Sequence, residues 1–190
     1  TLVTSGGISG VHHGSKAGFL KTTTDIDLVW NNSEINTVVI ATRHNQHASQ
    51  VISAIESGKN IFVEKPLALK LTELDMIDKA FIKANKSRKN PLKLMIGFNR
   101  RFSPQIIKMK SLLDIKHEPK VIVITVNAGQ IPSEHWTQDP VIGGGRIIGE
   151  GCHFIDLMRY LVGKKIVSHH ATMIGSSPHI DIRSDKVSIN

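Results

Sequence analysis

The segment "NTVVIATRHNQHASQVISAIESGKNIFVEKP", residues 36–66, decides the fold. Short apolar runs at 37–41 and 60–63 predict two buried strands. Between them, apolar residues recur at the spacing of one helix face, and Gly58 suits the end of that helix. A strand, a helix and a strand within about 30 residues form a βαβ unit, so the two strands are expected to run parallel.

The residues that follow extend this pattern. Thr72 and Asp75 resemble a capping box, which predicts the start of an amphipathic helix. An apolar run at 94–98 predicts a third strand. Residues 1–98 are therefore expected to be α/β, with part of a doubly wound parallel sheet.

After residue 98 the pattern changes. Ser103 and Pro104 are typical of the N-cap and first position of a helix, and a glycine-rich loop precedes a second helix that Gly163 ends. Further strands are predicted at 120–129, 165–174 and 186–190. Strands that follow one another without helices favour an antiparallel sheet, so residues 99–190 are expected to form an incomplete α+β domain with a mostly antiparallel sheet.

The composition is that of an ordinary globular chain of 190 residues. No apolar run approaches the roughly 20 residues of a membrane span, so no membrane contact is expected. One cysteine excludes an internal disulfide and fits a cytoplasmic location. The net charge of +8 favours an anionic ligand such as a nucleotide, phosphate or uronate. Aromatic residues are only 5% and the lysines are dispersed, so nucleic acid is not the expected partner.

Polar residues follow each predicted strand of the parallel sheet. Ligands bind beyond the carboxyl ends of such strands, so these residues are expected to lie at one edge. They are Thr42, Arg43, His44, Asn45 and His47 after the first strand, Glu64, Lys65 and Pro66 after the second, and Asn99, Arg100 and Arg101 after the third. Each group alone also fits a solvated loop, but their convergence favours a site.

Lys65 is the sharpest candidate at this edge. Pro66 fixes its own φ and biases Lys65 towards an extended backbone, so the lysine leaves the strand on a stiff segment. An ammonium held there can stabilise negative charge on a substrate oxygen. The alternative is an ion pair with Glu64 or another carboxylate, which contributes little at a surface.

A second group of residues lies on the helix of the second half. Spacings of three and four place His153, Asp156 and Tyr160 on one face, with Glu150 one turn earlier. A histidine is a natural proton acceptor near neutral pH, and a carboxylate one turn away can orient it. The alternative is a surface His–Asp pair. A metal site is not expected, because Cys152 adjoins the histidine and no spaced ligand pair is present.

These residues resemble the Gfo/Idh/MocA family, which comprises glucose–fructose oxidoreductase, inositol dehydrogenase and their relatives. The matching pieces are "VVIATRHNQHA", "GKNIFVEKPLAL", "GFNRRFSP" and "GGGRIIGEGCHFIDL". "HWTQDPVIGGGRIIGEGCHFIDL" also looks like the branch fused behind a zinc-alcohol-dehydrogenase-like domain. The resemblance covers about residues 1 to 170.

The resemblance implies a Rossmann domain at 1–98 and a substrate and dimerisation domain at 99–190, with NAD(P)-dependent chemistry on a sugar or inositol. It implies that Lys65 lies between nicotinamide and substrate and that His153 assists proton transfer. Residues Ala41 to His47, with Glu64 and Pro66, are then expected along the NAD or NADP cofactor. Expected substrate residues are Asn99, Arg100, Arg101, Trp136, Arg146 and Asp156. A homo-oligomer through the second sheet is also expected.

Several positions depart from the family pattern. Gly149 stands where an Asp is common, so either Glu150 takes over or the acid is lost. Arg43 replaces the usual proline. No acidic residue follows the strand at the amino end, which leans towards NADP or no preference, and no G-x-G-x-x-G follows a strand. The natural protein is expected to be longer at both ends, and this piece alone is expected to bind cofactor weakly.

Two classes of function follow from these residues. In a dehydrogenase, Lys65 would polarise the reacting oxygen, His153 would exchange the proton, and Glu150 or Asp156 would orient the histidine. The alternative is a non-catalytic nucleotide- or sugar-binding module that supports a fused or partner enzyme. A third possibility, within enzymes, is NAD-assisted glycoside cleavage with no net redox change.

Overall fold

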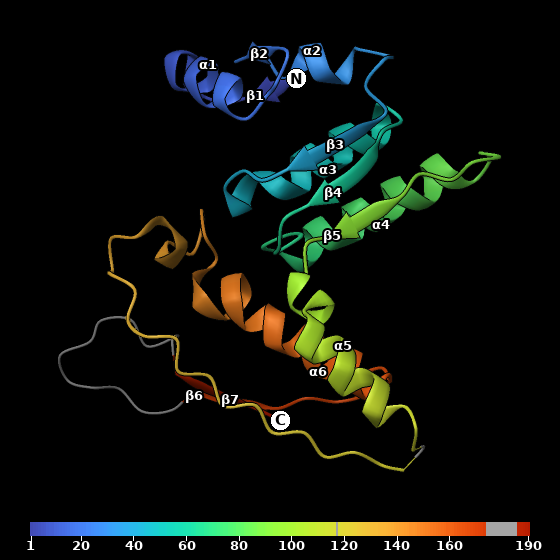
Figure 1. The fold of residues 1–190 in the computed structure, drawn as a ribbon, viewed down its shortest axis with the longest axis vertical. Coiled ribbons are helices and arrows are strands. Elements are labelled where there is room, and N and C mark those ends of the chain that lie inside the picture. The colour runs from blue at the N-terminus through green and yellow to red at the C-terminus, as the bar shows by residue number, and fades with distance from the viewer. Residues whose placement is uncertain (117, 174–185) are drawn as a thin grey trace.

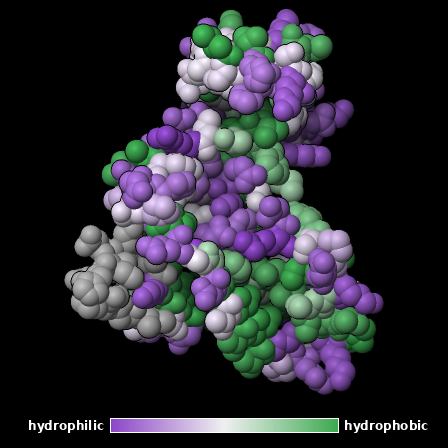
Figure 2. All heavy atoms as spheres, turned by 60° about the vertical axis from the view of Figure 1, so that its left-hand side comes forward, coloured by the Kyte–Doolittle hydropathy of each residue, from purple (hydrophilic) through white to green (hydrophobic). Residues whose placement is uncertain are grey.

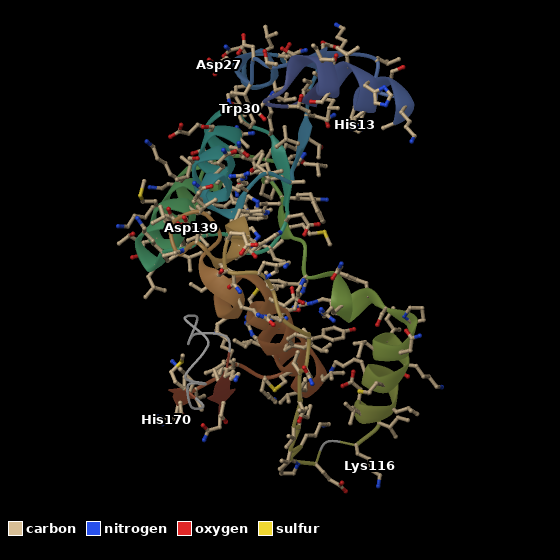
Figure 3. All side chains as sticks on the ribbon, turned by 90° about the vertical axis from the view of Figure 1, so that its left-hand side faces the viewer. His13, Asp27, Trp30, Lys116, Asp139 and His170 are labelled. Atoms are coloured by element: carbon tan, nitrogen blue, oxygen red, sulfur yellow. The ribbon has the colours of Figure 1, made fainter. Side chains whose placement is uncertain are left out.

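The computed structural model describes residues 1–116, 118–173 and 186–190. Three parts follow one another along the long axis of the molecule (Figure 1): an amino-terminal unit of residues 1–30, a sheet lobe of residues 36–98 and a helix lobe formed by the described residues from 99 onward. His13 and Lys116 lie at opposite ends of this axis, whereas Asp139 lies beside the sheet lobe although it comes from the second half of the sequence (Figure 3).

The amino-terminal unit is a small parallel βαβ arrangement. Its elements are β1 Leu2–Val3, α1 Gly7–Lys16, β2 Thr22–Thr23 and α2 Asp27–Trp30. β1 pairs with β2, and α1 packs closely on both strands. A Cβ atom at Gly10 would lie 2.3 Å from Thr4 Oγ1, and one at Gly14 would lie 2.3 Å from Thr22 Cγ2. The glycines of α1 therefore permit this close approach.

The sheet lobe contains the parallel sheet that the sequence predicts. Its elements are β3 Thr37–Ile40, α3 His44–Glu56, β4 Asn60–Val63, α4 Leu71–Asn85 and β5 Leu94–Ile96. The strand order is β3–β4–β5 and both pairs are parallel, which confirms the βαβ interpretation. Gly58 adopts a φ of 73° after α3, as expected for a helix end.

The core of this lobe lies between the sheet and its two helices. Helices α3 and α4 contact each other and cover one face of the sheet. Alternate strand residues such as Ile40 and Val63 are buried beneath them, together with Val51 and Ile55 of α3. Val39 points to the opposite face and is exposed, so this face is open in the part of the chain that the structure describes.

Lys59 is a buried charge at the start of β4. Its ammonium donates to the carbonyl oxygens of Asn32 and Ile35, both at 2.8 Å. These bonds tie the turn before β3 to the sheet and satisfy most of the ammonium's hydrogen-bonding capacity.

The start of α4 differs from the sequence prediction. The N-cap is Lys70, and the Glu73 carboxylate accepts hydrogen bonds from the backbone N–H groups of Leu69 and Lys70 at 2.9 and 3.1 Å. The predicted capping box of Thr72 and Asp75 is therefore wrong, because the helix begins before them. Likewise, the predicted strand at 94–98 ends at Ile96, where the backbone turns.

The helix lobe follows β5. Its elements are the 3₁₀ helix η1 Asn99–Phe102, α5 Pro104–Leu113, the 3₁₀ helix η2 Trp136–Gln138, the π-helix η3 Ile147–Gly151, α6 Cys152–Val162, β6 Ala171–Met173 and β7 Val187–Ile189. The Ser103 hydroxyl accepts from the Ile106 N–H, with Pro104 at the first helical position, as predicted. Gly163 ends α6 with a φ of 72°, and β6 pairs antiparallel with β7.

The predicted strand at 120–129 is wrong. This segment has no strand pairing, and Val121 and Val123 are 95% and 84% exposed. β-Branched residues form a strand only when a neighbouring strand accepts their backbone hydrogen bonds, and none of the described residues pairs with this segment. The strand predicted at 165–174 is reduced to β6, and its residue Ile174 lies outside the described residues. Figure 2 shows apolar side chains gathered over this lobe.

The helices of the described residues are too short, or too polar, to cross a lipid bilayer.

Candidate active site

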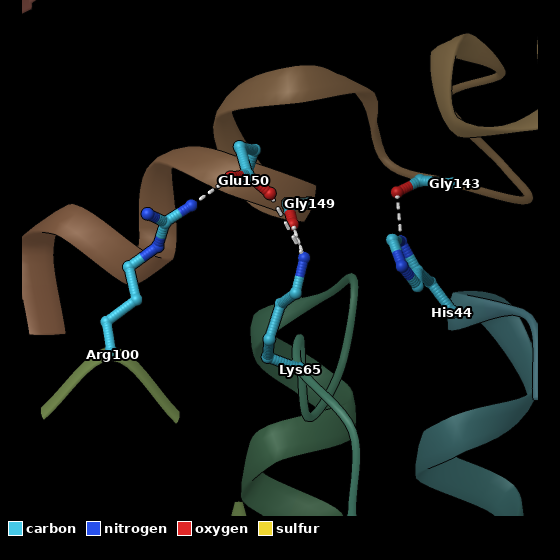
Figure 4. Close-up of polar contacts among 6 residues, drawn as sticks. All are labelled: His44, Lys65, Arg100, Gly143, Gly149 and Glu150. Carbon is cyan, nitrogen blue, oxygen red and sulfur yellow. Dashed lines mark hydrogen bonds and ion pairs between the residues drawn. The ribbon is translucent and has the colours of Figure 1, made fainter. Parts of the chain in front are cut away.

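The carboxyl ends of the parallel strands face the helix lobe, as the sequence predicts. Lys65 follows β4, and η1 continues from the end of β5. The π-helix η3 and the first turn of α6 face this edge from the second half of the chain (Figure 4). Residues more than eighty positions apart in the sequence therefore meet at one place.

Lys65 makes the central contact between the two lobes. Its ammonium donates to the carbonyl oxygen of Gly149 at 2.6 Å and lies 3.3 Å from Oε2 of Glu150 (Figure 4). The next residue, Pro66, is buried, and its carbonyl oxygen accepts from Nδ1 of His47 at 2.7 Å. The lysine is therefore held by the rigid exit of β4, and its amine reaches the turn that precedes α6.

Glu150 lies between two cations. Its other oxygen, Oε1, accepts from the Arg100 guanidinium at 2.7 Å. Burial acts to raise the pKa of Glu150, but Lys65, and after it His153 and Arg100, outweigh burial, so this pKa lies below its usual value. The carboxylate is therefore ionised at neutral pH.

His153 is buried at the same place. Its side chain is 6% exposed, and its ring stands edge-on to Phe98 with centroids 6.1 Å apart. Burial, followed by the nearby Lys65 cation, lowers the pKa of His153, and the Glu150 and Glu64 carboxylates oppose this only in part. The imidazole is therefore neutral at pH 7.

Nδ1 of His153 has no hydrogen-bond partner within the described part of the chain. The predicted orienting contact from Glu150 or Asp156 is thus absent at this nitrogen. Asp156 instead forms an ion pair with Arg101. His153 borders an open pocket, whereas its Nδ1 atom is itself buried from solvent.

An open cavity of about 500 Å³ borders these groups. Its lining residues are Asn99, Arg100, Phe102, Ser103, Glu150 and His153. Of the predicted substrate residues, Asn99 and Arg100 line this cavity. Arg146 lines a neighbouring cavity of about 610 Å³ that also reaches Glu150, and Trp136 lies elsewhere, against His44.

Residues 14–89 match the family described as "Oxidoreductase family, NAD-binding Rossmann fold", and residues 118–181 match its "C-terminal alpha/beta domain". The chain belongs to the Gfo/Idh/MocA family. The resemblance in the sequence is confirmed, and so is the expected fold class, a partial Rossmann-type parallel sheet followed by a second domain that combines helices and an antiparallel sheet. The fusion to a zinc-alcohol-dehydrogenase-like domain stays a prediction.

Named relatives share this family. The chain is 35% identical over 137 residues to scyllo-inositol 2-dehydrogenase (NAD(+)) of Bacillus subtilis, covering 70% of this chain and 37% of the relative. It is 31% identical over 147 residues to inositol 2-dehydrogenase of Rhizobium meliloti, covering 77% and 42%. Levoglucosan dehydrogenase in complex with NADH and levoglucosan superposes with a TM-score of 0.72 at 26% identity, covering 93% and 48%. The chain thus spans less than half the length of each.

The structure gives a reason for the glycine at position 149, where the resemblance leads us to expect an Asp. A Cβ atom there would lie 3.2 Å from Cε1 of His44, so the glycine leaves room for this ring. His44 is buried, donates from Nδ1 to the Gly143 carbonyl at 2.7 Å, and stands edge-on to Trp136 with centroids 4.8 Å apart. Burial lowers the pKa of His44, although the bond to Gly143 opposes this. Sequence reasoning missed this contact between the lobes.

The segment predicted to lie along the cofactor divides into two groups. Ala41, Thr42 and Arg43 are exposed at the edge of the sheet and remain available to a nicotinamide cofactor. His47 is 0% exposed, and its ring nitrogens bond to the carbonyl oxygens of Pro66 and Thr42, so its ring offers no surface to a cofactor. The backbone N–H of Asn45 donates to the Ile142 carbonyl at 3.1 Å, so the start of α3 is already capped.

A nicotinamide cofactor fits the exposed edge formed by Ala41, Thr42 and Arg43 next to Lys65. A metal has no comparable support. Among the residues that the structure describes, no group of three or more His, Cys, Asp and Glu side chains is placed to hold an ion. Burial raises the pKa of the Cys152 thiol to about 11, so it stays protonated and is a poor ligand.

Proposed function

We propose that this chain is part of an NAD(H)-dependent dehydrogenase that oxidises a hydroxyl group of a cyclic polyol or sugar. The observation that carries this proposal is the meeting of Lys65 with the Glu150–His153 turn at the carboxyl edge of the sheet. The relatives named for inositol and levoglucosan support the substrate class. Names that specify NAD(+) and NADH favour NAD over NADP.

Lys65 and His153 have complementary chemical roles in this proposal. A bound nicotinamide would supply the acceptor for the hydride that leaves the carbon carrying the reacting hydroxyl. The Lys65 ammonium stabilises the negative charge that develops on the oxygen as its proton leaves. The neutral imidazole of His153, which lines the cavity, accepts that proton. Glu150 fixes the ammonium in place and remains ionised, so it acts as an orienting group in this proposal.

The exposed strip Ala41, Thr42 and Arg43, together with the backbone around Lys65 and Pro66, would hold the cofactor. The substrate occupies the cavity lined by Asn99, Arg100 and His153. In this proposal the reacting hydroxyl lies between the lysine and the histidine.

The proposal is tested with Lys65→Met and His153→Gln in the full-length protein. NAD(P)H absorbance is followed with a panel of inositols and neutral sugars. Removing one preorganised cation is expected to lower kcat by about 100- to 1,000-fold, and removing the proton acceptor by about 100-fold. Lys86→Met, at the exposed end of α4, is the control.

Turnover of Lys65→Met within a few-fold of the wild type contradicts the proposal. Binding of NADH or a sugar without any turnover of the wild type favours the non-catalytic module. Cleavage of a glycoside without net NADH formation indicates the third possibility.

The assembly and location of the whole protein are part of the same proposal. We expect a homo-oligomer formed through the sheet of the helix lobe, as the family resemblance implies, and a cytoplasmic location, which the single cysteine fits. Light scattering of the full-length protein measures its mass; a monomer at micromolar concentration contradicts the first expectation.

A further inference from the structure

The 3₁₀ helix η1 presents two successive arginines to the helix that carries His153. Arg100 donates to Oε1 of Glu150 at 2.7 Å, and its guanidinium carbon lies 4.5 Å from the centroid of the Phe154 ring. Arg100 therefore contacts both the Glu150 carboxylate and the Phe154 ring, which lie one helical turn apart on the same segment.

Arg101 repeats this arrangement with partners six residues further along the same segment. Its Nε donates to Oδ2 of Asp156 at 3.0 Å, a second nitrogen contacts Oδ1, and its guanidinium lies 5.1 Å from the centroid of the Tyr160 ring. The Asp156 side chain is only 10% exposed. A bidentate pair of this kind fixes both distance and orientation, which a single ion pair does not.

The contacts of the two arginines are placed symmetrically about His153. The carboxylates of Glu150 and Asp156 lie three residues before and three residues after it, and each ring lies four residues after its carboxylate. The turn that carries His153 is therefore held from both sides by η1. Because η1 continues directly from Phe98, the same segment also supplies the ring that packs against the imidazole.

The arginines act on a histidine whose Nδ1 atom has no hydrogen bond to hold the ring. No protein group bonds to Nδ1 of His153 within the described residues, so the ring is positioned by its packing against Phe98 and by where α6 lies relative to η1. Arg101 has both of its partners on α6 and does not line the cavity of about 500 Å³. A substrate-binding role for Arg101 therefore has no support in the geometry.

We propose that Arg100 and Arg101 are positioning residues that fix the His153 imidazole, with Arg101 acting through Asp156 and Tyr160. The reaction for which the imidazole is positioned is that of the proposed function. The arginines would hold the His153 ring in this place whether or not the protein is a dehydrogenase.

The kinetic test uses Arg101→Met, Asp156→Asn and the double variant of the full-length protein. A displaced proton acceptor is expected to lower kcat by about 10- to 100-fold while KM changes by less than about 2-fold. Because the two residues act as one unit, the double variant is expected to lose no more than either single variant. Arg159→Met, an exposed arginine on the same helix, is the control.

A series of conservative substitutions distinguishes a loss of positioning from a general loss of folding. Tyr160→Phe keeps the ring beneath Arg101 and is expected to retain activity within about 2-fold, whereas Tyr160→Leu removes the ring and is expected to reduce kcat. Arg101→Lys keeps the charge but loses the planar bidentate contact, so it is expected to resemble Arg101→Met. A rise in KM with unchanged kcat in Arg101→Met overturns the proposal, because it indicates substrate binding.

A second readout does not require turnover. The ring signals of ¹³C-labelled histidines are recorded, and His153 is assigned with the His153→Gln variant. Arg101→Met and Tyr160→Leu are expected to move the His153 signal, and Arg159→Met is expected to leave it in place. If no substrate is turned over but the signal moves as expected, the proposed function fails and the positioning role stands. An unmoved His153 signal in both variants overturns the positioning role.

Discussion

The sheet lobe and the helix lobe hold their site residues in different ways. Lys65 follows β4, which is hydrogen-bonded on one side to β3 and on the other to β5, and buried Ile61 and Val63 anchor that strand. His153 lies on α6, which the side-chain pairs of Arg100 and Arg101 hold against η1. The lysine is thus placed by a backbone ladder, and the histidine by contacts between side chains.

This difference has a practical lesson. A residue placed by a central strand moves only when the sheet itself is disrupted, so the site lysine and the stability of the lobe are coupled. A residue placed by side-chain pairs can be displaced by one substitution that leaves the fold intact. Substitutions in the two lobes are therefore expected to give different combinations of lost stability and lost activity.

The largest effect is expected from Val63→Asp in β4. This substitution buries an unpaired carboxylate in the core and is expected to cost about 4 kcal/mol or more, enough to unfold the sheet lobe. Val39→Asp, on the exposed face of β3, is the matched control and is expected to cost less than about 1 kcal/mol. Urea denaturation of the full-length protein measures both; equal midpoints for the two variants contradict the assignment of the core face.

A smaller loss is expected from Gly143→Ala. A Cβ atom at this position would lie 2.3 Å from Cα of Thr137 and 2.5 Å from two backbone oxygens, so the loop that accepts from His44 must shift. The expected cost is about 1–3 kcal/mol of stability. Gly151→Ala is the control, because its Cβ atom would meet only Ile147 at ordinary contact distances. Thermal unfolding compares the two, and a Gly143→Ala variant as stable as Gly151→Ala is inconsistent with this contact.

The two buried histidines are expected to make stability depend on pH. Burial is the main cause that lowers the pKa of His44 and of His153 below 6.5, so the folded state binds fewer protons than the unfolded state. Their stabilising contribution is fully present above pH 6.5 and is lost as the pH falls from 6.5 through the lowered pKa values. His153→Gln is expected to flatten this dependence, and the exposed His12→Gln is not. The free energy of unfolding of each variant is measured from neutral to mildly acidic pH. If His153→Gln and His12→Gln show the same pH dependence, the buried His153 is not its cause.

The smallest effect concerns the start of α4. Glu73→Ala removes the acceptor of two backbone N–H groups and is expected to cost about 1 kcal/mol. Thr72→Ala is expected to cost less than about 0.5 kcal/mol, because Thr72 is already inside the helix. Urea denaturation measures the loss of stability in each variant. A larger loss for Thr72→Ala than for Glu73→Ala would support the capping box predicted from the sequence.

The part of the fold that the sequence predicts well is the part with local regularity. The βαβ unit of the sheet lobe repeats apolar residues at fixed spacings, so its strands, its helix and the exit at Lys65 follow from neighbours in the chain. The helix of His153 and its end at Gly163 follow in the same way. The predicted strand at 120–129 lacks a partner in the described residues, and pairing with a distant strand has no local signature.

The candidate site was predicted as a set of residues but not as a set of contacts. Lys65, Glu150 and His153 do meet at the edge of the sheet. The pairing of Arg101 with Asp156 and of His44 with the Gly143 carbonyl joins residues that are 55 and 99 positions apart. No periodicity links such positions, so only the folded chain shows that the two arginines expected to bind substrate pair with carboxylates of η3 and α6.

The position of Lys59 at the start of β4 determines how its amine reacts. Its amine is enclosed and bonded to two carbonyl oxygens, so an acylating reagent cannot reach it while the sheet is intact. The lysines on the outer surface react at once, whereas this one becomes reactive only when the turn at Asn32 and Ile35 separates from the strand. The rate at which Lys59 is acylated therefore reports how often this part of the protein opens.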